Sequence, residues 1–455
     1  MPWKTILTVV TFGCLLLAPQ YAPAVKSHRL FDPQAISAVW TFPMPAQAAA
    51  DSTAAMEEVR AARLQLLAPQ NLSDPNHELD RFYASLLRGG ITRILHYGDS
   101  PTTGDLITAD ARALLQKQFG DAGAGFVLIA KPWAWYYHRG VEMDASNWQI
   151  DVAGVTAIKD GMHGLGGASF QGSAGAVAHW NFKERQSRIV EVAYLAQPEG
   201  GSFSIEADGA PAGFVDTSAP ESAPGFTSFD LPDGARQFTL RVTNGAVRLY
   251  GVEFRKKTSG VIYSSLGING ANITVLSHAF NGAHWAAELK HYKPNLVVLA
   301  YGTNESAYAK FVETTWPKEL KTAVRRIQTA LPNASILLMS PMDRGEKNEA
   351  GEIDTVPALP RLVEIESQVA AETGVAFFNT FEAMGGGGTM ARWYAAEPRL
   401  VGADFIHPLP AGAKIVGELL YNALRDGYNE YKLRTLNQRA AGEEAAAPRT
   451  GDESR

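Results

Sequence analysis

The stretch ITRILHYGDSPTTGDL, residues 91–106, joins a short strand to a helix through a polar turn. Ile91–His96 is a β-type run, and Gly98-Asp99-Ser100 follows where the run ends. A helical pattern comes next, and its apolar side holds Leu106, Ile107, Ala111, Leu114 and Leu115. The stretch therefore predicts one unit of an α/β fold, with its turn at the sheet edge where active sites of such folds collect.

The same alternation recurs in the second half of the chain. Continuous apolar runs occur at residues 296–299, 336–339 and 375–378. Helical stretches lie beside them, near residues 278–291, 313–330 and 361–373. Because continuous apolar strands are typical of sheets buried on both faces, the sequence predicts a parallel central sheet with helices on both sides.

Between residues 151 and 256 the pattern changes to short strands. Phe238–Val242 alternates apolar and polar residues, and turn residues such as Asn244-Gly245 punctuate the segment. Evenly spaced short strands with such turns predict a β-sandwich or jelly roll. We therefore expect an all-β module at residues 151–256, inserted between two parts of an α/β domain at residues 56–150 and 257–435.

The composition excludes several classes of protein. The 455 residues are 46% hydrophobic and 19% charged, which is typical of a globular chain. A net charge of -6 gives no electrostatic support for nucleic-acid binding. Cys14 is the only cysteine, which excludes an intrachain disulfide or thiolate metal site. Since the ten histidines form no metal-binding pattern such as H-E-x-x-H, we expect no cofactor and no metal.

The two ends of the chain carry signals of another kind. Residues 1–24 contain one charge, an apolar run and Ala22-Pro23-Ala24, as in an export signal peptide. An uncleaved anchor, with N-terminal membrane association, is the alternative. Residues 25–55 are rich in Ala and Pro and predict a linker, and residues 436–455 predict a disordered tail. We thus expect an exported protein, periplasmic or extracellular, of undetermined oligomeric state.

A serine near the start of the α/β pattern and a histidine near its end fit nucleophilic catalysis. The amide of Ser100 points from a helix N-terminus and can donate to an oxyanion. Asp404-Phe405-Ile406-His407 lies on the loop before the last helical stretch. His407 can take the proton of the Ser100 hydroxyl, and Asp404 can orient the imidazole. Taken alone, Ser100 is better explained as a helix N-cap.

Two further loops offer hydrogen-bond donors. Asn304, in Gly302-Thr303-Asn304-Glu305, directly follows the buried strand at residues 296–300, so its side-chain amide can donate to an oxyanion. Gly270 follows a strand-like run and can present its backbone N–H where a side chain would block approach. An ordinary turn is the alternative for each.

Taken together, these four features resemble the SGNH hydrolases, the GDSL-type esterases and lipases. That family carries a Ser in G-D-S, a Gly, an Asn in G-x-N and a D-x-x-H pair in the order found here. The resemblance implies a flavodoxin-like three-layer fold, with Ser100 as nucleophile, His407 as base and Asp404 in support. It also implies an oxyanion hole built from the Ser100 amide, the Gly270 amide and the Asn304 side chain.

One departure points to a subgroup. Ser100 and Gly270 are separated by the whole β module, whereas a compact member has one β-α-β unit there. The arrangement is similar to bacterial peptidoglycan and polysaccharide O-acetylesterases with an inserted carbohydrate-binding-like β module. Ala246–Phe254 resembles the closing strand of such modules.

Residues 131–139, KPWAWYYHR, are dense in aromatic side chains and lie shortly before the β module. Aromatic faces stack on sugar rings, so the stretch can line a glycan cleft. An aromatic hinge that packs two domains together is the alternative, and it is favoured by the usual burial of such side chains.

The sequence therefore predicts an exported serine esterase that hydrolyses ester groups, expected to be O-acetyl, on an acylated polysaccharide or peptidoglycan. An O-acyltransferase of the same fold uses the same acyl-enzyme and stays open as an alternative. A non-catalytic glycan-binding envelope protein is the third possibility, and the complete Ser/Gly/Asn/Asp-His set argues against it.

Overall fold

A six-stranded sheet forms the centre of the α/β portion in the computed structural model, which describes residues 71–155, 158, 160–183 and 187–446. The strand order is β1 (Leu72–Ser73), β17 (Ala376–Phe378), β14 (Ser335–Met339), β13 (Leu296–Ala300), β2 (Ile91–Gly98) and β12 (Gly260–Gly267). β1 pairs with β17 in antiparallel fashion, and the other neighbours pair in parallel. The carboxyl ends of β2, β12 and β13 therefore meet at one edge.

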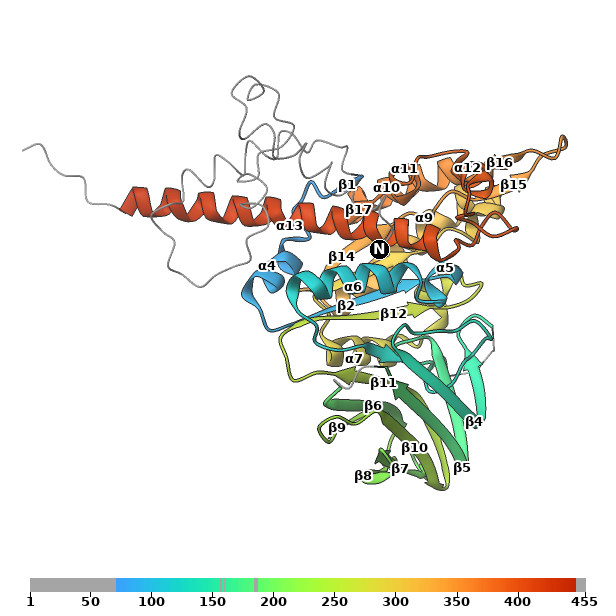
Figure 1. The fold of residues 1–455 in the computed structure, drawn as a ribbon, viewed down its shortest axis with the longest axis vertical. Coiled ribbons are helices and arrows are strands. Elements are labelled where there is room, and N and C mark those ends of the chain that lie inside the picture. Colours follow the sequence, from blue (N-terminus) through green and yellow to red (C-terminus); the bar gives the residue numbers. More distant parts are fainter. Residues whose placement is uncertain (1–70, 156–157, 159, 184–186, 447–455) are drawn as a thin grey trace, which may run out of the picture. The chain divides into compact units, whose positions relative to one another are not determined.

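Helices cover both faces of this sheet (Figure 1). One face carries α4 (Asp80–Arg88), α6 (Ile107–Phe119) and α13 (Pro410–Ala446). The other carries α7 (Gly282–Tyr292), α9 (Trp316–Ala330) and α10 (Leu359–Thr373). Neighbouring strand residues divide between the faces, since Val298 packs with the first set and Val297 with the second. The mixed α/β fold predicted from the sequence is confirmed.

Shorter elements complete this portion. They are α5 (Ser100–Thr103), the π-helical turn η2 (Val275–Ala279), the 3₁₀ turn η3 (Glu305–Ala307), α8 (Ala309–Thr314), β15 (Gly345–Lys347), β16 (Ile353–Thr355), α11 (Thr380–Ala383) and α12 (Thr389–Ala395). Several of them lie on the loops that follow the central strands.

A second, all-antiparallel sheet lies between the two parts of the α/β portion in sequence. Its strands are β3 (Gly125–Val127), β4 (Val141–Val152), β5 (Ala168–Phe182), β6 (Ile189–Ala196), β7 (Ser202–Ala207), β8 (Ala210–Asp216), β9 (Ala223–Asp230), β10 (Gln237–Asn244) and β11 (Ala246–Arg255). The main path runs β8-β7-β10-β5-β11-β6-β9, with β3 beside β11 and β4 beside β5. A separate β module is thus present, and its description as a jelly roll stays a prediction.

The β sheet begins earlier than the change in composition at residue 151. β4, with the sequence VEMDASNWQIDV, lies almost wholly before that residue, and apolar and polar residues alternate along most of it. It pairs with β5 from Val141 opposite Phe182 to Val152 opposite Ala168. The strand has no continuous apolar run, and this alternation was the signal that could have identified it. The domain limits given above stay a prediction.

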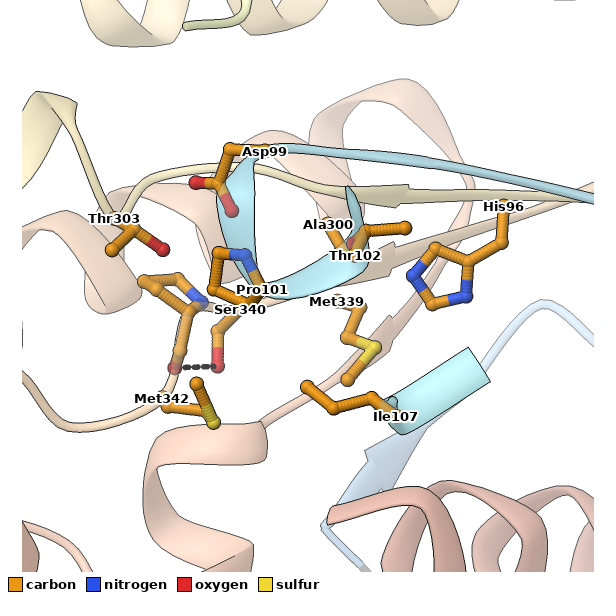
Figure 2. A pocket seen from close by; sticks show the side chains of 11 residues that line it. His96, Asp99, Pro101, Thr102, Ile107, Ala300, Thr303, Met339, Ser340 and Met342 are labelled. Atoms are coloured by element: carbon orange, nitrogen blue, oxygen red, sulfur yellow. Dashed lines mark hydrogen bonds between the residues drawn. The ribbon is translucent and has the colours of Figure 1, made fainter. Parts of the chain in front are cut away.

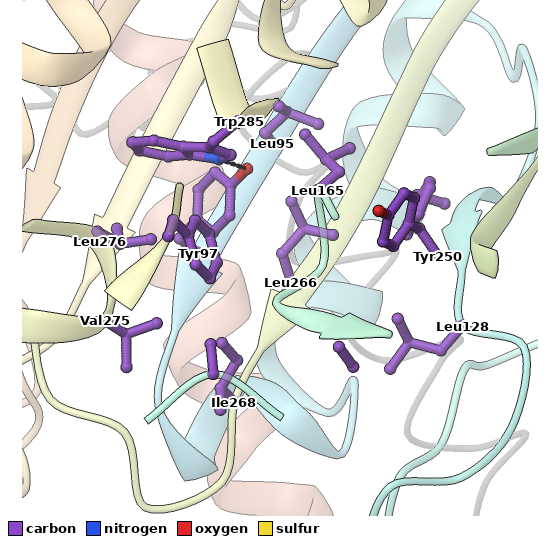
Figure 3. Packing of buried hydrophobic residues seen from close by; sticks show 14 of the residues in the cluster. Leu95, Tyr97, Leu128, Leu165, Tyr250, Leu266, Ile268, Val275, Leu276 and Trp285 are labelled. Carbon is purple, nitrogen blue, oxygen red and sulfur yellow. Dashed lines mark hydrogen bonds between the residues drawn. The ribbon is translucent and has the colours of Figure 1, made fainter. Parts of the chain in front are cut away.

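The β module packs on the α/β portion through a shared apolar core (Figure 3). Tyr250 of β11 lies in the same cluster as Leu266 of β12. On the far side of β12, Trp285 Nε1 donates to Tyr97 Oη at 3.1 Å. A buried ion pair adds to this contact, with Arg93 Nε 3.2 Å from Glu253 Oε2.

The end of the chain corrects one prediction. α13 continues to Ala446, where the sequence predicted a disordered tail from residue 436 onward. Ala and Glu are strong helix formers, and extending an existing helix needs no new nucleus. Residues 447–455, and the predicted signal and linker at residues 1–55, lie outside the described residues. No helix within the described part of the chain has the length and apolarity to span a bilayer.

Candidate active site

Ser100 stands directly after β2, at the start of α5. Gly98, the last residue of β2, is in register with Gly267 of β12 on one side and Ala300 of β13 on the other. A Cβ at Gly98 would lie 2.2 Å from Thr102 Oγ1, so only glycine allows the chain to turn here at once. This turn leaves Ser100 partly exposed at the carboxyl edge of the sheet.

The structure brings the three predicted catalytic side chains together. His407 Nε2 lies 2.8 Å from Ser100 Oγ, and His407 Nδ1 lies 2.7 Å from Asp404 Oδ2. Because Asp404 can only accept, Nδ1 carries the ring proton and Nε2 is left to accept from the serine hydroxyl. The side chains of His407 and Asp404 are 46% and 49% exposed, so water reaches them. The arrangement can deprotonate Ser100 for nucleophilic attack.

The D-x-x-H loop is held by Asp404 itself. Its Oδ1 accepts from the backbone N–H groups of Ile406 at 3.0 Å and His407 at 3.1 Å. Partial burial raises the pKa of Asp404, but the hydrogen bonds from His407 and these amides outweigh burial and lower it below 3.8. Asp404 is therefore ionised at neutral pH and can stabilise a charged imidazole.

The predicted oxyanion donors Gly270 and Asn304 lie on the loops that follow β12 and β13, the strands that flank β2. Asn304 Nδ2 donates to the carbonyl of Ala271 at 2.8 Å, which ties the Asn304 loop to the Gly270 loop. Its second N–H stays available to a ligand. Gly270 is exposed with φ at 69°, in the left-handed region that favours glycine, and no partner for its N–H occurs among the described residues. The role of both groups stays a prediction.

Residues 234–415 match the model of the GDSL-like lipase/acylhydrolase family. The match includes Gly270, Asn304, Asp404 and His407, and it leaves out Ser100, which the β module separates from them in sequence. The chain carries a GDSL-like lipase/acylhydrolase domain. It is a carboxylic ester hydrolase, and the resemblance to SGNH hydrolases seen in the sequence is confirmed.

One solved structure agrees with this assignment. A peptidoglycan O-acetylesterase is 25% identical, with a TM-score of 0.66, over 80% of this chain and 99% of that chain. A family two carbohydrate esterase from Clostridium thermocellum, solved with cellohexaose, is 14% identical with a TM-score of 0.28, over 61% of this chain and 98% of that one. The second likeness is too low to carry an argument. A search of the curated proteins gives no match.

Glu305 of the esterase was not identified from the sequence. Its Oε1 accepts from the Ile273 N–H at 2.7 Å, and its Oε2 accepts from the Gly302 N–H at 3.1 Å. One buried carboxyl group thus joins the loop that carries Gly270 to the loop that carries Asn304. Burial raises its pKa to about 7. Its position next to Asn304 in G-T-N-E was the available signal, but nothing local shows which amides it meets.

Asp99, next to the nucleophile, is also buried. Burial and then the nearby Glu305 carboxyl group raise its pKa to about 8, and its Oδ2 is unpaired. At neutral pH the esterase therefore keeps Asp99 largely protonated. A full negative charge beside Ser100 would oppose an oxyanion at that position, and the protonated form removes this repulsion.

A small cavity lies beneath the turn between β2 and α5, which carries Asp99 (Figure 2). It measures about 20 Å³, which is room for about one water molecule. The lining residues are His96, Asp99, Pro101, Thr102, Ile107, Ala300, Thr303, Met339, Ser340, Pro341 and Met342. An acyl chain does not fit into this cavity.

The loop after β14 supports both halves of the site. Arg344 Nη1 donates to the Thr303 carbonyl at 2.6 Å, and the Gly345 N–H donates to the Phe405 carbonyl at 2.9 Å. One loop thus contacts the Asn304 segment and the D-x-x-H segment. No group of three or more His, Cys, Asp or Glu side chains that could hold a metal ion occurs among the described residues.

Proposed function

We propose that this esterase is exported and removes O-acetyl groups from a carbohydrate polymer, with peptidoglycan as the first candidate. The observation that carries the proposal is the continuous hydrogen-bonded chain Ser100–His407–Asp404 at the open edge of the sheet. Support for the substrate comes from the peptidoglycan O-acetylesterase, whose structure is covered almost completely. Support for export comes from the signal-like residues 1–24.

The first half of the reaction acylates the serine. Ser100 Oγ attacks the acetyl carbonyl carbon while His407 Nε2 takes the hydroxyl proton. The carbonyl electron pair moves to oxygen, where the amides of Ser100 and Gly270 and the Asn304 side chain can donate to it. The C–O bond to the sugar then breaks, and the imidazolium returns its proton to the sugar oxygen.

The second half releases acetate. His407 removes a proton from water, the water oxygen attacks the acetyl-serine, and the Ser100 hydroxyl is restored. The half-exposed His407 and Asp404 favour water as the acceptor, because a transferase has to keep water from the acyl-enzyme.

Acetate release by the full chain tests the proposal. The substrates are O-acetylated peptidoglycan fragments, acetylated xylan and p-nitrophenyl acetate, and the comparison is wild type against Ser100→Ala. We expect release from a glycan by wild type, at a rate unaffected by added sugar acceptor, and its loss in the variant. Ser73→Ala, an exposed serine on β1, is the control. Hydrolysis of p-nitrophenyl acetate without release from any glycan would contradict the substrate class.

A further inference from the structure

Exposed aromatic side chains gather around the active site. The large aromatic side chains most exposed in the described part of the chain are Trp135, Tyr137, Phe214 and Tyr308, at 56%, 40%, 62% and 67%. Phe214 lies on β8, at an end of the second sheet. The other three lie on loops next to site residues. Exposed apolar side chains that gather next to a site are typical of a surface that binds a ligand.

The loop that carries Trp135 and Tyr137 is firmly anchored. Tyr136, between them, is buried, and its hydroxyl accepts from the Leu128 N–H at 3.0 Å. His138 is buried too, with Nε2 3.0 Å from the Ala124 carbonyl. Buried and exposed side chains thus alternate. Anchors on both sides of Tyr137 hold the exposed rings in place.

The anchor continues toward α5. The Arg139 N–H donates to Asp105 Oδ2 at 2.9 Å, and Asp105 forms a buried ion pair with Arg112 at 2.6 Å. The hinge and the cleft interpretations of residues 131–139 therefore apply to different side chains. Trp133 packs against Tyr136 in the shared core, whereas Trp135 and Tyr137 face solvent.

Trp135 is close to the nucleophile. A Cβ at Gly104, which caps α5, would lie 4.0 Å from the Trp135 carbonyl. Because the four-residue helix from Ser100 spans about 6 Å, the backbone of Trp135 lies within about 10 Å of the backbone of Ser100. This is a distance that a short oligosaccharide spans.

Tyr308 stands on the other side of β2. It follows η3, which begins next to Asn304, so at about 2 Å per residue it lies about 8 Å from that residue. The Trp135 loop follows β3, whose Phe126 N–H donates to Ser264 of β12. Since β12 and β13 flank β2, the two aromatic groups lie on opposite sides of Ser100 along the sheet edge.

We infer that Trp135, Tyr137 and Tyr308 form a carbohydrate-binding track that holds a glycan strand across Ser100. The C–H faces of sugar rings pack on aromatic faces without needing charge. When the ester lies within a polymer, the flanking sugars come to lie over this track. The inference rests on the proposed function, because it takes the acetylated glycan as the occupant. A lipid surface and a second copy of the chain are the other occupants that the test distinguishes.

The test measures binding apart from turnover. O-acetylated peptidoglycan fragments of several disaccharides are titrated into Ser100→Ala protein, alone and combined with Trp135→Ala or Tyr308→Ala. Each added change should weaken binding about tenfold, the upper range for one aromatic contact. Phe214→Ala is the matched control and should leave binding unchanged. In the active enzyme, kcat/KM should fall further for the fragments than for p-nitrophenyl acetate.

The possible outcomes separate the inference from the proposed function. Unchanged glycan affinity in both Trp135→Ala and Tyr308→Ala, or a loss of affinity in Phe214→Ala instead, overturns the track. The track is also overturned if these two variants keep their glycan affinity but dissociate a dimer or abolish binding to vesicles. Fragments that bind to Ser100→Ala but release no acetate with wild type would support the track and contradict the proposed function. Acetate release without measurable binding would do the reverse.

Discussion

Two layers of acidic and basic groups lie at the same edge of the sheet and differ in their access to water. Ser100, His407 and Asp404 form the outer layer, and the latter two are about half exposed. Asp99, Glu305 and Glu366 form the inner layer, each no more than 2% exposed. The outer groups are open to water, whereas Glu305 of the inner layer joins the loop that carries Gly270 to the loop that carries Asn304.

Burial raises the pKa of the carboxyl groups in both layers, but the net shifts are opposite. Asp404 keeps a pKa below 3.8 because the hydrogen bonds that it accepts outweigh its partial burial. Burial raises the pKa of Glu366 well above 4.5, and the Glu305 carboxyl group adds to this. A charge at this edge is therefore favoured in the outer layer only. Each prediction below tests this division.

The largest effect is expected from the outer layer. His407→Ala removes the base and should lower kcat by about 10⁴-fold, with little change in the melting temperature, because the side chain is half exposed. The matched control is His278→Ala, since His278 is also exposed and lies 2.7 Å from a carboxylate, Glu319. Steady-state kinetics and thermal melts check both. Equal losses in the two variants would contradict a special role for His407.

Within the inner layer, Glu305 and Glu366 should differ. Glu305→Gln replaces one acceptor by a donor, so either the Ile273 or the Gly302 amide loses its partner. We expect kcat to fall about tenfold, because one loop with a predicted oxyanion donor is misplaced. The free energy of unfolding should fall by about 1–3 kcal/mol, because one buried amide loses its partner.

Glu366→Gln is the matched control for Glu305→Gln. Its Oε2 has no hydrogen-bond partner, so an uncharged amide of the same shape should leave kcat unchanged. KM, kcat and stability are measured separately for both variants. A purely structural role of Glu305 would lower stability without a specific loss of kcat. Similar kcat values for both variants would show that Glu305 does not position the loops.

The smallest effect concerns Asp99 and pH. Its folded-state pKa of about 8 lies above the ordinary carboxyl value, so the folded chain holds a proton that the unfolded chain releases. This contribution to stability is complete below about pH 4 and is lost as the pH rises through 8. Asp99→Asn mimics the protonated form, so its melting temperature minus that of wild type should increase by at least about 2 °C between pH 4 and pH 9. A difference in melting temperature that stays constant across this pH range would contradict a raised pKa.

The residues of the outer layer could be predicted from the sequence, whereas Glu305 of the inner layer could not. Ser100 and His407 each belong to a short motif placed on a loop beside a predicted strand or helix, so their meeting follows from the order of the elements. Glu305 acts through the Ile273 amide, 32 residues away, and no local pattern encodes that contact. Its burial also depends on how η3 packs, which a turn sequence does not specify.

The same distinction holds for the fold. Of the central strands, β13 and β17 are apolar throughout, and their identity as strands follows from composition, as for Leu296–Ala300. β4 alternates apolar and polar residues, and it was not identified although this alternation stands in its own sequence. Residues 436–446 show a different error, because low apolar content was taken as disorder although Ala and Glu extend α13. Continuous apolar strands were predicted, whereas β4 and the end of α13, which lack an apolar run, were not.

The central claim is that Ser100 carries the acyl group between the two halves of the reaction. The most direct test is mass spectrometry of proteolytic peptides. Wild type is mixed with p-nitrophenyl acetate and quenched in acid within the first turnovers before digestion. The account predicts one acetyl adduct, on Ser100, that decays as substrate runs out and is absent from Ser100→Ala. Acetate release without an adduct on Ser100, or with unchanged turnover in Ser100→Ala, would contradict it.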